Sequence, residues 1–292
     1  MLNTDKKLVG ISLIKNVVKN DYPLADNIFQ HIDFYDEWVF IAPKEDQDLD
    51  GTVACLQQAL NDLGTTKHLK ITVVRVDWPT EDSFYEEAID KKLQSSVINH
   101  IRGSYSADTW FHKHDIDEFI SSRDQDIILN MIAVFNYGVE NTMMSTNWVQ
   151  LVKNTRTYVW DPTKKKNHFV RNIGNISFPG NDASDIVTDV GDDTYLSYVN
   201  TYHTGYVKKE DLLTLKIKEH IKLNKSVYAD KISNIEIESF KFEFPENVPG
   251  TKSWPLGLNV LLGLPNRLEY FQTEVKDLPE VLKKDNWLYF DK

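Results

Sequence analysis

The chain has 292 residues, enough for one large domain or a domain with an appendage, and its net charge of −11 disfavours binding along the phosphate backbone of nucleic acid. A lone cysteine, Cys55, excludes an internal disulfide framework and a cysteine zinc cluster. Since it has neither an apolar run of about 18 residues nor a signal-peptide core, we expect a cytoplasmic protein with no membrane span.

Short apolar segments alternate with segments of helical periodicity over the first part of the chain. Strands are expected at residues 6–14, 36–42, 69–77 and 109–114. Helices are expected at residues 23–32, from the Asp50-Gly51-Thr52 segment onwards, and at 86–101. This alternation predicts right-handed crossovers and an α/β fold, with a mostly parallel sheet flanked by helices.

The second half of the chain is less regular. Further strands are expected at residues 143–152 and 195–207 and around the alternating Phe240, Phe242 and Phe244, and a helix at 210–223. Residues 163–193 read as a long polar stretch with no predicted element, and prolines and glycines break the pattern after 245. We place a boundary near residue 205, between a larger domain at 1–205 and a helical or irregular extension at 206–292 that packs on it.

Polar side chains follow each strand of the first half, where open α/β sheets bind their ligands. These residues include Lys15, Asn16, Asp46, Asp77, Asp115 and Asp117. Acids spaced two apart at a strand end can face one cation, and hard oxygen ligands suit Mg²⁺ or Mn²⁺. The alternative for Asp115 and Asp117 is a solvated turn before a helix, where the dipole favours acids.

Later residues supply further candidates for a site that handles phosphate. His203 is an acceptable Mn²⁺ ligand, although a lone histidine is more often structural. Arg171 and Lys216 are the basic side chains best placed to neutralise a diphosphate leaving group, with solvated surface cations as the alternative for most of the basic set. Asp182 and Asp185 are candidates for a general base on the acceptor side, or parts of a solvated loop.

Several catalytic motifs are missing from the chain. No phosphate-binding P-loop and no G-x-G-x-x-G segment follows the first strand, which disfavours a nucleoside triphosphatase and a dinucleotide oxidoreductase. No G-x-S-x-G elbow occurs, so a serine hydrolase lacks support.

Four segments occur in an order that is similar to family 2-like glycosyltransferases of the GT-A fold. They are ISLIKN at 11–16, the strand and D-G-T segment at 36–52, KHDIDEF at 113–119 and HTGYVK at 203–208. The resemblance covers roughly residues 6 to 220 and implies a GT-A-like, Rossmann-like catalytic domain that binds a nucleotide sugar.

The resemblance also implies an activity, a cofactor and partners. Asp115 and Asp117 would bind Mn²⁺ or Mg²⁺ and the donor diphosphate, and His203 would be a late metal or phosphate ligand. Lys15, Asn16 and Asp46 would lie near the base and ribose. The expected enzyme is a metal-dependent glycosyltransferase that moves a sugar from a nucleotide-diphosphate sugar to the hydroxyl of a glycan or other acceptor.

Two alternatives to this activity stay open. A sugar nucleotidyltransferase would need a Gly-rich, Arg-containing loop after the first strand, where this chain reads KNVVK at 15–19. A non-catalytic module that binds glycans or nucleotides would keep the fold and the binding site without turnover.

Overall fold

The computed structural model describes residues 6–78, 86–138, 140–152, 154–179, 185–208, 210–223, 270–272 and 278–283. Two compact units divide the chain: residues 1–147 with 164–201, and residues 148–163 with 202–292. The expected boundary near residue 205 lies close to the second crossing between the units, but residues 148–163 group with the C-terminal part. The strand expected around Phe242 lies outside the described residues. Among the described helices, none is long and apolar enough to cross a membrane.

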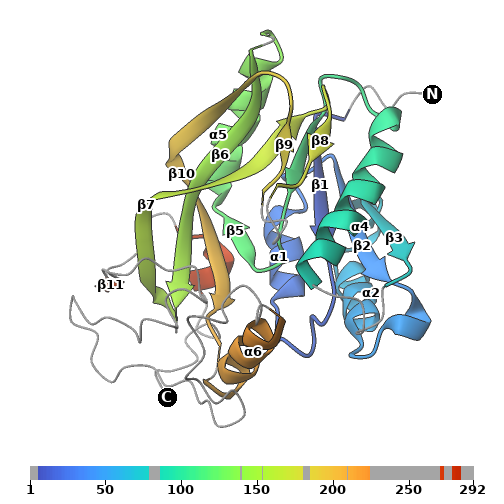
Figure 1. Cartoon of the computed structure of the whole chain (residues 1–292), viewed down its shortest axis with the longest axis vertical. Helices are drawn as coiled ribbons and strands as arrows, with labels where there is room; N and C mark the ends of the chain where they lie inside the picture. The colour runs from blue at the N-terminus through green and yellow to red at the C-terminus, as the bar shows by residue number, and fades with distance from the viewer. Residues whose placement is uncertain are drawn as a thin grey trace. The chain divides into compact units, whose positions relative to one another are not determined.

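The first unit begins with a block of four parallel strands (Figure 1). They are β1 (Leu8–Leu13), β2 (Glu37–Pro43), β3 (Ile71–Val76) and β4 (Trp110–Lys113), in the spatial order β3-β2-β1-β4. All three neighbouring pairs run parallel. β1 and β2 are buried almost throughout, as strands covered on both faces must be, whereas β3 lies at the edge and is partly exposed. The parallel sheet expected from the sequence is confirmed.

The later strands extend this sheet beyond β4. β7 (Asn154–Arg171) pairs antiparallel with β4, and β6 (Asn141–Val152), β10 (Asp192–Tyr206) and β5 (Glu118–Ile120) complete the order. β11 (Tyr270–Gln272) pairs antiparallel with β7, and β8 (Ile176–Ser177) and β9 (Val187–Thr188) form a separate two-stranded sheet. β7, β8 and β9 lie partly or wholly in the stretch where the sequence predicted no element. Each is stabilised by a partner strand, which the polar composition does not reveal.

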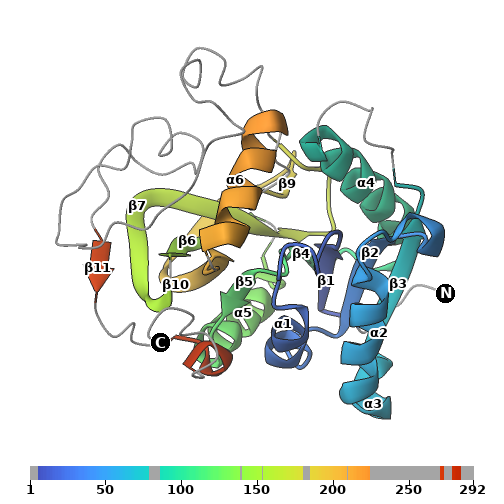
Figure 2. The same cartoon turned by 90° about the horizontal axis from the view of Figure 1, so that it is seen from below.

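Helices cover the two faces of the parallel block (Figure 2). α1 (Leu24–His31), α2 (Thr52–Asp62) and α5 (Ser122–Phe135) contribute to one apolar cluster with Trp38 and Phe40 of β2, and α4 (Glu86–Ile101) contributes to another with Val39 and Ile41. Alternate β2 side chains thus enter opposite clusters, as a strand requires. The α/β class with helices on both faces is confirmed.

Short helices and the last long helix complete the described elements. They are α3 (Thr65–His68), η1 (Glu45–Gln47), η2 (Arg102–Ser104), η3 (Glu280–Lys283) and α6 (Glu210–Leu223). Helix α5 has no counterpart among the expected elements. It starts after Ser121, whose Oγ accepts a hydrogen bond from the Asp124 backbone N–H at 3.2 Å.

Candidate functional site

A charged turn joins β4 to β5 at the carboxyl end of the parallel block. Lys113 is the last residue of β4 and lies in register with Ile11 of the neighbouring strand β1. The Glu118 backbone N–H donates to the Asp115 carbonyl at 2.9 Å, which closes the turn before β5 begins. The turn therefore projects from the sheet edge at which the parallel strands end.

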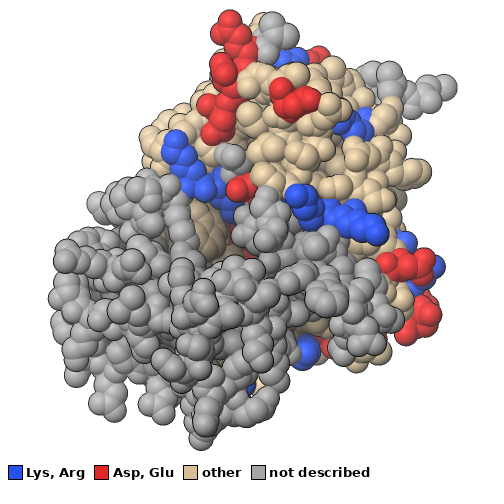
Figure 3. All heavy atoms as spheres, in the orientation of Figure 1, with Lys and Arg blue, Asp and Glu red and all other residues tan. Residues whose placement is uncertain are grey.

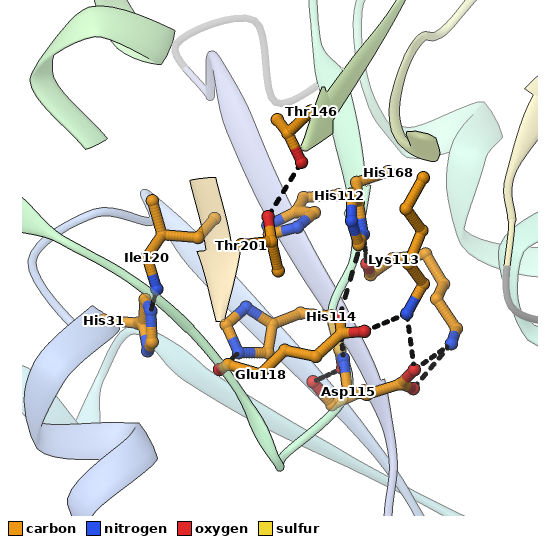
Figure 4. Close-up of polar contacts among 12 residues, drawn as sticks. His31, His112, Lys113, His114, Asp115, Glu118, Ile120, Thr146, His168 and Thr201 are labelled. Carbon is orange, nitrogen blue, oxygen red and sulfur yellow. Dashed lines mark hydrogen bonds and ion pairs between the residues drawn. The ribbon is translucent and has the colours of Figure 1, made fainter. Parts of the chain in front are cut away.

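Four side chains at this turn form a lysine–carboxylate cluster: Lys113, Asp115, Glu118 and Lys166. Figure 4 labels the first three. Lys113 Nζ donates to both Asp115 oxygens, at 2.6 and 2.5 Å. Lys166 Nζ, from β7, donates to Asp115 Oδ2 at 3.0 Å and also to Glu118 Oε1. The cluster thus links two sheet strands and the turn through charge-assisted hydrogen bonds.

Most side chains of the lysine–carboxylate cluster are buried, which affects their pKa values. The Lys113, Lys166 and Glu118 side chains are 5%, 8% and 1% exposed, whereas that of Asp115 is 34% exposed. Burial alone would raise the pKa of Asp115, but the neighbouring Lys113 and Lys166 outweigh it and hold that pKa well below its ordinary value. Burial likewise opposes the charge on Lys166, yet Asp115 and Glu118 raise its pKa above the ordinary value. Asp115 and Lys166 are therefore charged at neutral pH, and Asp115 is the group through which the cluster meets solvent.

A network of buried aromatic side chains lies beneath the turn. Tyr35 Oη is 2.6 Å from His112 Nδ1 and 2.6 Å from His114 Nδ1. His114 Nε2 lies 3.0 Å from the Glu118 carbonyl, which only accepts, so this nitrogen carries the proton. Tyr35 therefore donates to His114 and accepts from His112.

Two more buried histidines fix the same region. His168 Nδ1 donates to the Lys113 carbonyl at 3.3 Å, and His31 Nε2 accepts from the Ile120 N–H at 3.0 Å. Burial is the main cause of the lowered pKa of all four histidines, and it brings that of His31 to about 3. Neutral imidazoles thus hold the backbone at both ends of the charged turn.

Asp117, the second acid of the predicted pair, is 7% exposed. Within the part of the chain that the structure describes, no group of three or more His, Cys, Asp or Glu side chains is arranged to hold a metal ion. The role of Asp117 as a metal ligand therefore stays a prediction.

The loops after β1, β2 and β3 end at the same edge of the sheet and carry four other predicted residues. Lys15 Nζ lies 5.1 Å from the centre of the Trp78 ring, and Asn16 has a left-handed backbone with φ of 55°. Asp77 pairs with Lys44 at 2.5 Å, and Asp46 is exposed in η1. The sheet thus gathers Lys15, Asn16, Asp46 and Asp77 at the strand ends, as expected for parallel strands.

Arg171 lies elsewhere. It is in register with Trp110, at the opposite end of β4 from the charged turn. Its guanidinium donates to the carbonyls of Ala107 and Gly138, at 3.1 and 2.7 Å, and to Asp108. Arg171 therefore stabilises the loops at the end of β4 opposite the charged turn. For this reason we leave it out of the candidate site.

His203 and Lys216 belong to the second unit. His203 Nδ1 is 2.7 Å from Gln150 Oε1, and its ring lies 5.0 Å from that of Trp148. Lys216 Nζ donates to the Gly205 carbonyl at 3.2 Å. Their roles as metal or phosphate ligands stay predictions, as does that of Asp185. Asp182 lies outside the described residues.

The site residue that sequence reasoning passed over is Lys113, and it gave no specific site role to Lys166, a member of the basic set. Lys113 precedes Asp115 by two positions, the spacing that puts alternate strand side chains on one face, and this was the available signal. No comparable signal links Lys166 to the turn, because its contact with Asp115 joins positions 51 residues apart.

No protein-family model and no curated protein matches this chain. Among solved structures, S. aureus TarS 1–349 is 12% identical with a TM-score of 0.40, covering 78% of this chain and 73% of that chain. It has also been solved in complex with UDP, and the chain spans 45% of a longer TarS structure.

Two further structures are similar at a comparable level. The mannosyltransferase PcManGT from Pyrobaculum calidifontis, in complex with GDP-Man and Mn²⁺, is 14% identical with a TM-score of 0.43, over 80% of this chain and 66% of that chain. Mannose-6-phosphate isomerase from Helicobacter pylori is 10% identical with a TM-score of 0.33, over 79% and 81%. At such TM-scores these likenesses assign no activity. The chain is an α/β protein whose parallel strands end at a cluster of lysines and carboxylates.

Proposed function

We propose that this chain is a glycosyltransferase that moves a sugar from a nucleotide-diphosphate sugar to an acceptor hydroxyl. The observation that supports this most is the lysine–carboxylate cluster at the carboxyl ends of β1 and β4. That edge is where open α/β sheets bind nucleotides. The K-x-D-x-D-E segment of the turn is also the most distinctive of the four segments that resemble GT-A glycosyltransferases.

The charges of this edge suit an anionic donor despite the net charge of −11. On the face shown in Figure 3, the described Lys and Arg side chains lie in separate patches, two of them at middle height, and the acids gather mainly at the top and right. Lys113 and Lys166 add two buried ammonium groups beside the partly exposed Asp115. Such groups stabilise the negative charge that grows on a departing diphosphate.

The other predicted residues also take proposed roles. Lys15, Asn16, Asp46 and Asp77 are candidates for contacts with the nucleoside, since they follow strands of the same sheet edge. His203 and Lys216 remain candidates for the donor phosphates, and Asp182 or Asp185 for the base that deprotonates the acceptor.

The contacts of Asp115 decide whether the predicted Mn²⁺ or Mg²⁺ ion fits beside it. Carboxylate oxygens suit such ions chemically, but both oxygens of Asp115 already accept from lysine ammonium groups. This arrangement does not fit Asp115 as a metal ligand, so the proposed reaction uses no step through a metal.

A turnover assay tests the proposed function. The purified chain is incubated with UDP-, GDP- and dTDP-sugars, and release of the nucleoside diphosphate is measured with and without an acceptor. Asp115→Asn should lower the rate about 100-fold with at least one donor, because Asp115 holds both ammonium groups beside the donor.

The matched control is Asp126→Asn, an exposed acid on α5, which should keep the native rate. Equal rates for Asp115→Asn and the native chain would remove the cluster from the mechanism. Binding of a nucleotide sugar without turnover over long incubation would favour the non-catalytic module instead.

A further inference from the structure

The two ammonium groups of the lysine–carboxylate cluster lie close to the position that a metal ion bound to Asp115 would occupy. Lys113 Nζ is 2.5 Å and Lys166 Nζ is 3.0 Å from the same oxygen, Asp115 Oδ2. A Mg²⁺ ion sits about 2.1 Å from a ligating oxygen. From whichever side it approached Oδ2, the ion would therefore lie within about 5 Å of both nitrogens.

The charges of the cluster are already balanced. Its two ammonium groups, on Lys113 and Lys166, face two carboxylates, on Asp115 and Glu118, so the formal charges cancel. A divalent ion at Asp115 would add two positive charges beside two others. Like charges at such a distance repel strongly where little water screens them.

The lysines are not free to move away and make room for an ion. The side chains of Lys113 and Lys166 are 5% and 8% exposed. If Lys166 left, Glu118, whose side chain is 1% exposed, would lose its ammonium partner. A buried carboxylate without a partner is strongly unfavourable, so the cluster resists this rearrangement.

We propose that the lysine–carboxylate cluster excludes a divalent metal from Asp115, so that the donor nucleotide binds and reacts without Mn²⁺ or Mg²⁺ at this residue. This inference rests on the proposed glycosyltransferase function. In the transfer, the bond between the sugar C1 and the diphosphate oxygen breaks, and its electron pair stays on the departing nucleoside diphosphate. The acceptor oxygen forms the new bond to C1 and gives its proton to a carboxylate base.

Direct metal titration of the full chain tests the inference. Free Mn²⁺ is followed by electron paramagnetic resonance, with the chain alone and with UDP or GDP added. Thermal stabilisation by each nucleotide is measured in EDTA and in Mn²⁺. We expect no submillimolar Mn²⁺ binding, and the same nucleotide-induced shift in melting temperature in EDTA as in Mn²⁺.

A lysine variant tests the physical cause. Lys166→Gln removes an ammonium group from both Asp115 and Glu118, so Mn²⁺ should bind about tenfold more tightly or better than to the native chain. Lys165→Gln is the matched control, because Lys165 is the exposed neighbour on β7 and should leave Mn²⁺ affinity unchanged. A folded Lys166→Gln chain with no gain in affinity would contradict the proposed cause.

Other outcomes decide the inference even if Lys166→Gln does not fold. Submillimolar Mn²⁺ binding to the native chain that Asp115→Asn abolishes would overturn it, as would nucleotide binding that requires Mn²⁺. If no nucleotide sugar binds in EDTA or in Mn²⁺, the proposed function fails. The Mn²⁺ titration of the chain alone still reports whether the cluster excludes the ion.

Discussion

Tyr35 connects two core histidines through one hydroxyl group. Its oxygen lies 2.6 Å from the Nδ1 atoms of both His112 and His114, and all three side chains are buried. Because His114 also donates to the Glu118 carbonyl, the direction of each hydrogen bond is fixed. The Glu118 carbonyl thereby fixes which nitrogen of His114 is protonated, and the Tyr35 hydroxyl then fixes that of His112.

Removal of this hydroxyl should leave two buried nitrogens without their partner. Tyr35→Phe should lower the free energy of unfolding by about 2–4 kcal/mol, since each unsatisfied buried polar group costs about 1–3 kcal/mol. Urea unfolding followed by circular dichroism measures the change. Tyr137→Phe is the control, because Tyr137 is 96% exposed and should be neutral. Equal losses in the two variants would mean that the Tyr35 hydroxyl contributes nothing.

Strands β1 and β2 show how the elements of the first unit fit together. Successive β2 side chains enter opposite apolar clusters, with Trp38 and Phe40 on one face and Val39 and Ile41 on the other. On β1, Gly10 lies next to the Tyr35 and Trp38 rings, and a Cβ atom built there would come within 2.9 Å of atoms in both. The missing side chain of Gly10 makes room for the aromatic layer beneath the charged turn.

A methyl group at this position should therefore overpack the core. Gly10→Ala should cost about 1–3 kcal/mol of stability, as extra methylenes in well-packed cores do. The midpoint of urea unfolding reports the cost. In Gly103→Ala, the control, the added Cβ meets nothing within 4 Å, so little loss is expected there. An unchanged midpoint for Gly10→Ala would show that the two rings can move aside.

At the scale of the whole molecule, the stability of the fold should depend steeply on pH in mild acid. Burial lowers the pKa of His31 to about 3 from an ordinary 6.5 and lowers those of His112, His114 and His168 as well. Below pH 6.5 the unfolded chain binds protons that the folded chain does not. Stability is therefore complete above that pH and falls as the pH decreases, by up to about 1.4 kcal/mol per pH unit for each histidine.

Urea unfolding between pH 7.5 and 5 measures this slope. His31→Gln should flatten it by about one histidine's share, whereas His100→Gln should leave it unchanged because His100 is exposed on α4. Equal slopes for the native chain and His31→Gln would contradict a neutral His31 in the fold.

The sequence predicted the parallel block well and the rest of the molecule less well. Segments such as Leu8–Leu13 and Glu37–Pro43 can be recognised as strands from their local sequence, because strands covered on both faces are mostly apolar. β7 was missed since its lysines look solvated until the sheet buries Lys166. Asp115 was placed correctly at a strand end, but its lysine partners depend on the pairing of β4 with β7, which no local pattern encodes.

The same distant pairing bears on how the protein forms during synthesis. Lys166, which lies 48 positions beyond Glu118 in the chain, reaches it only after β7 has joined β4. Contacts between distant positions form slowly, because a long loop must close first. In a nascent chain that has not yet emerged past Arg171, Glu118 lacks the ammonium group of Lys166. We therefore expect the parallel block to form early and the ion pairs of the charged turn to form last.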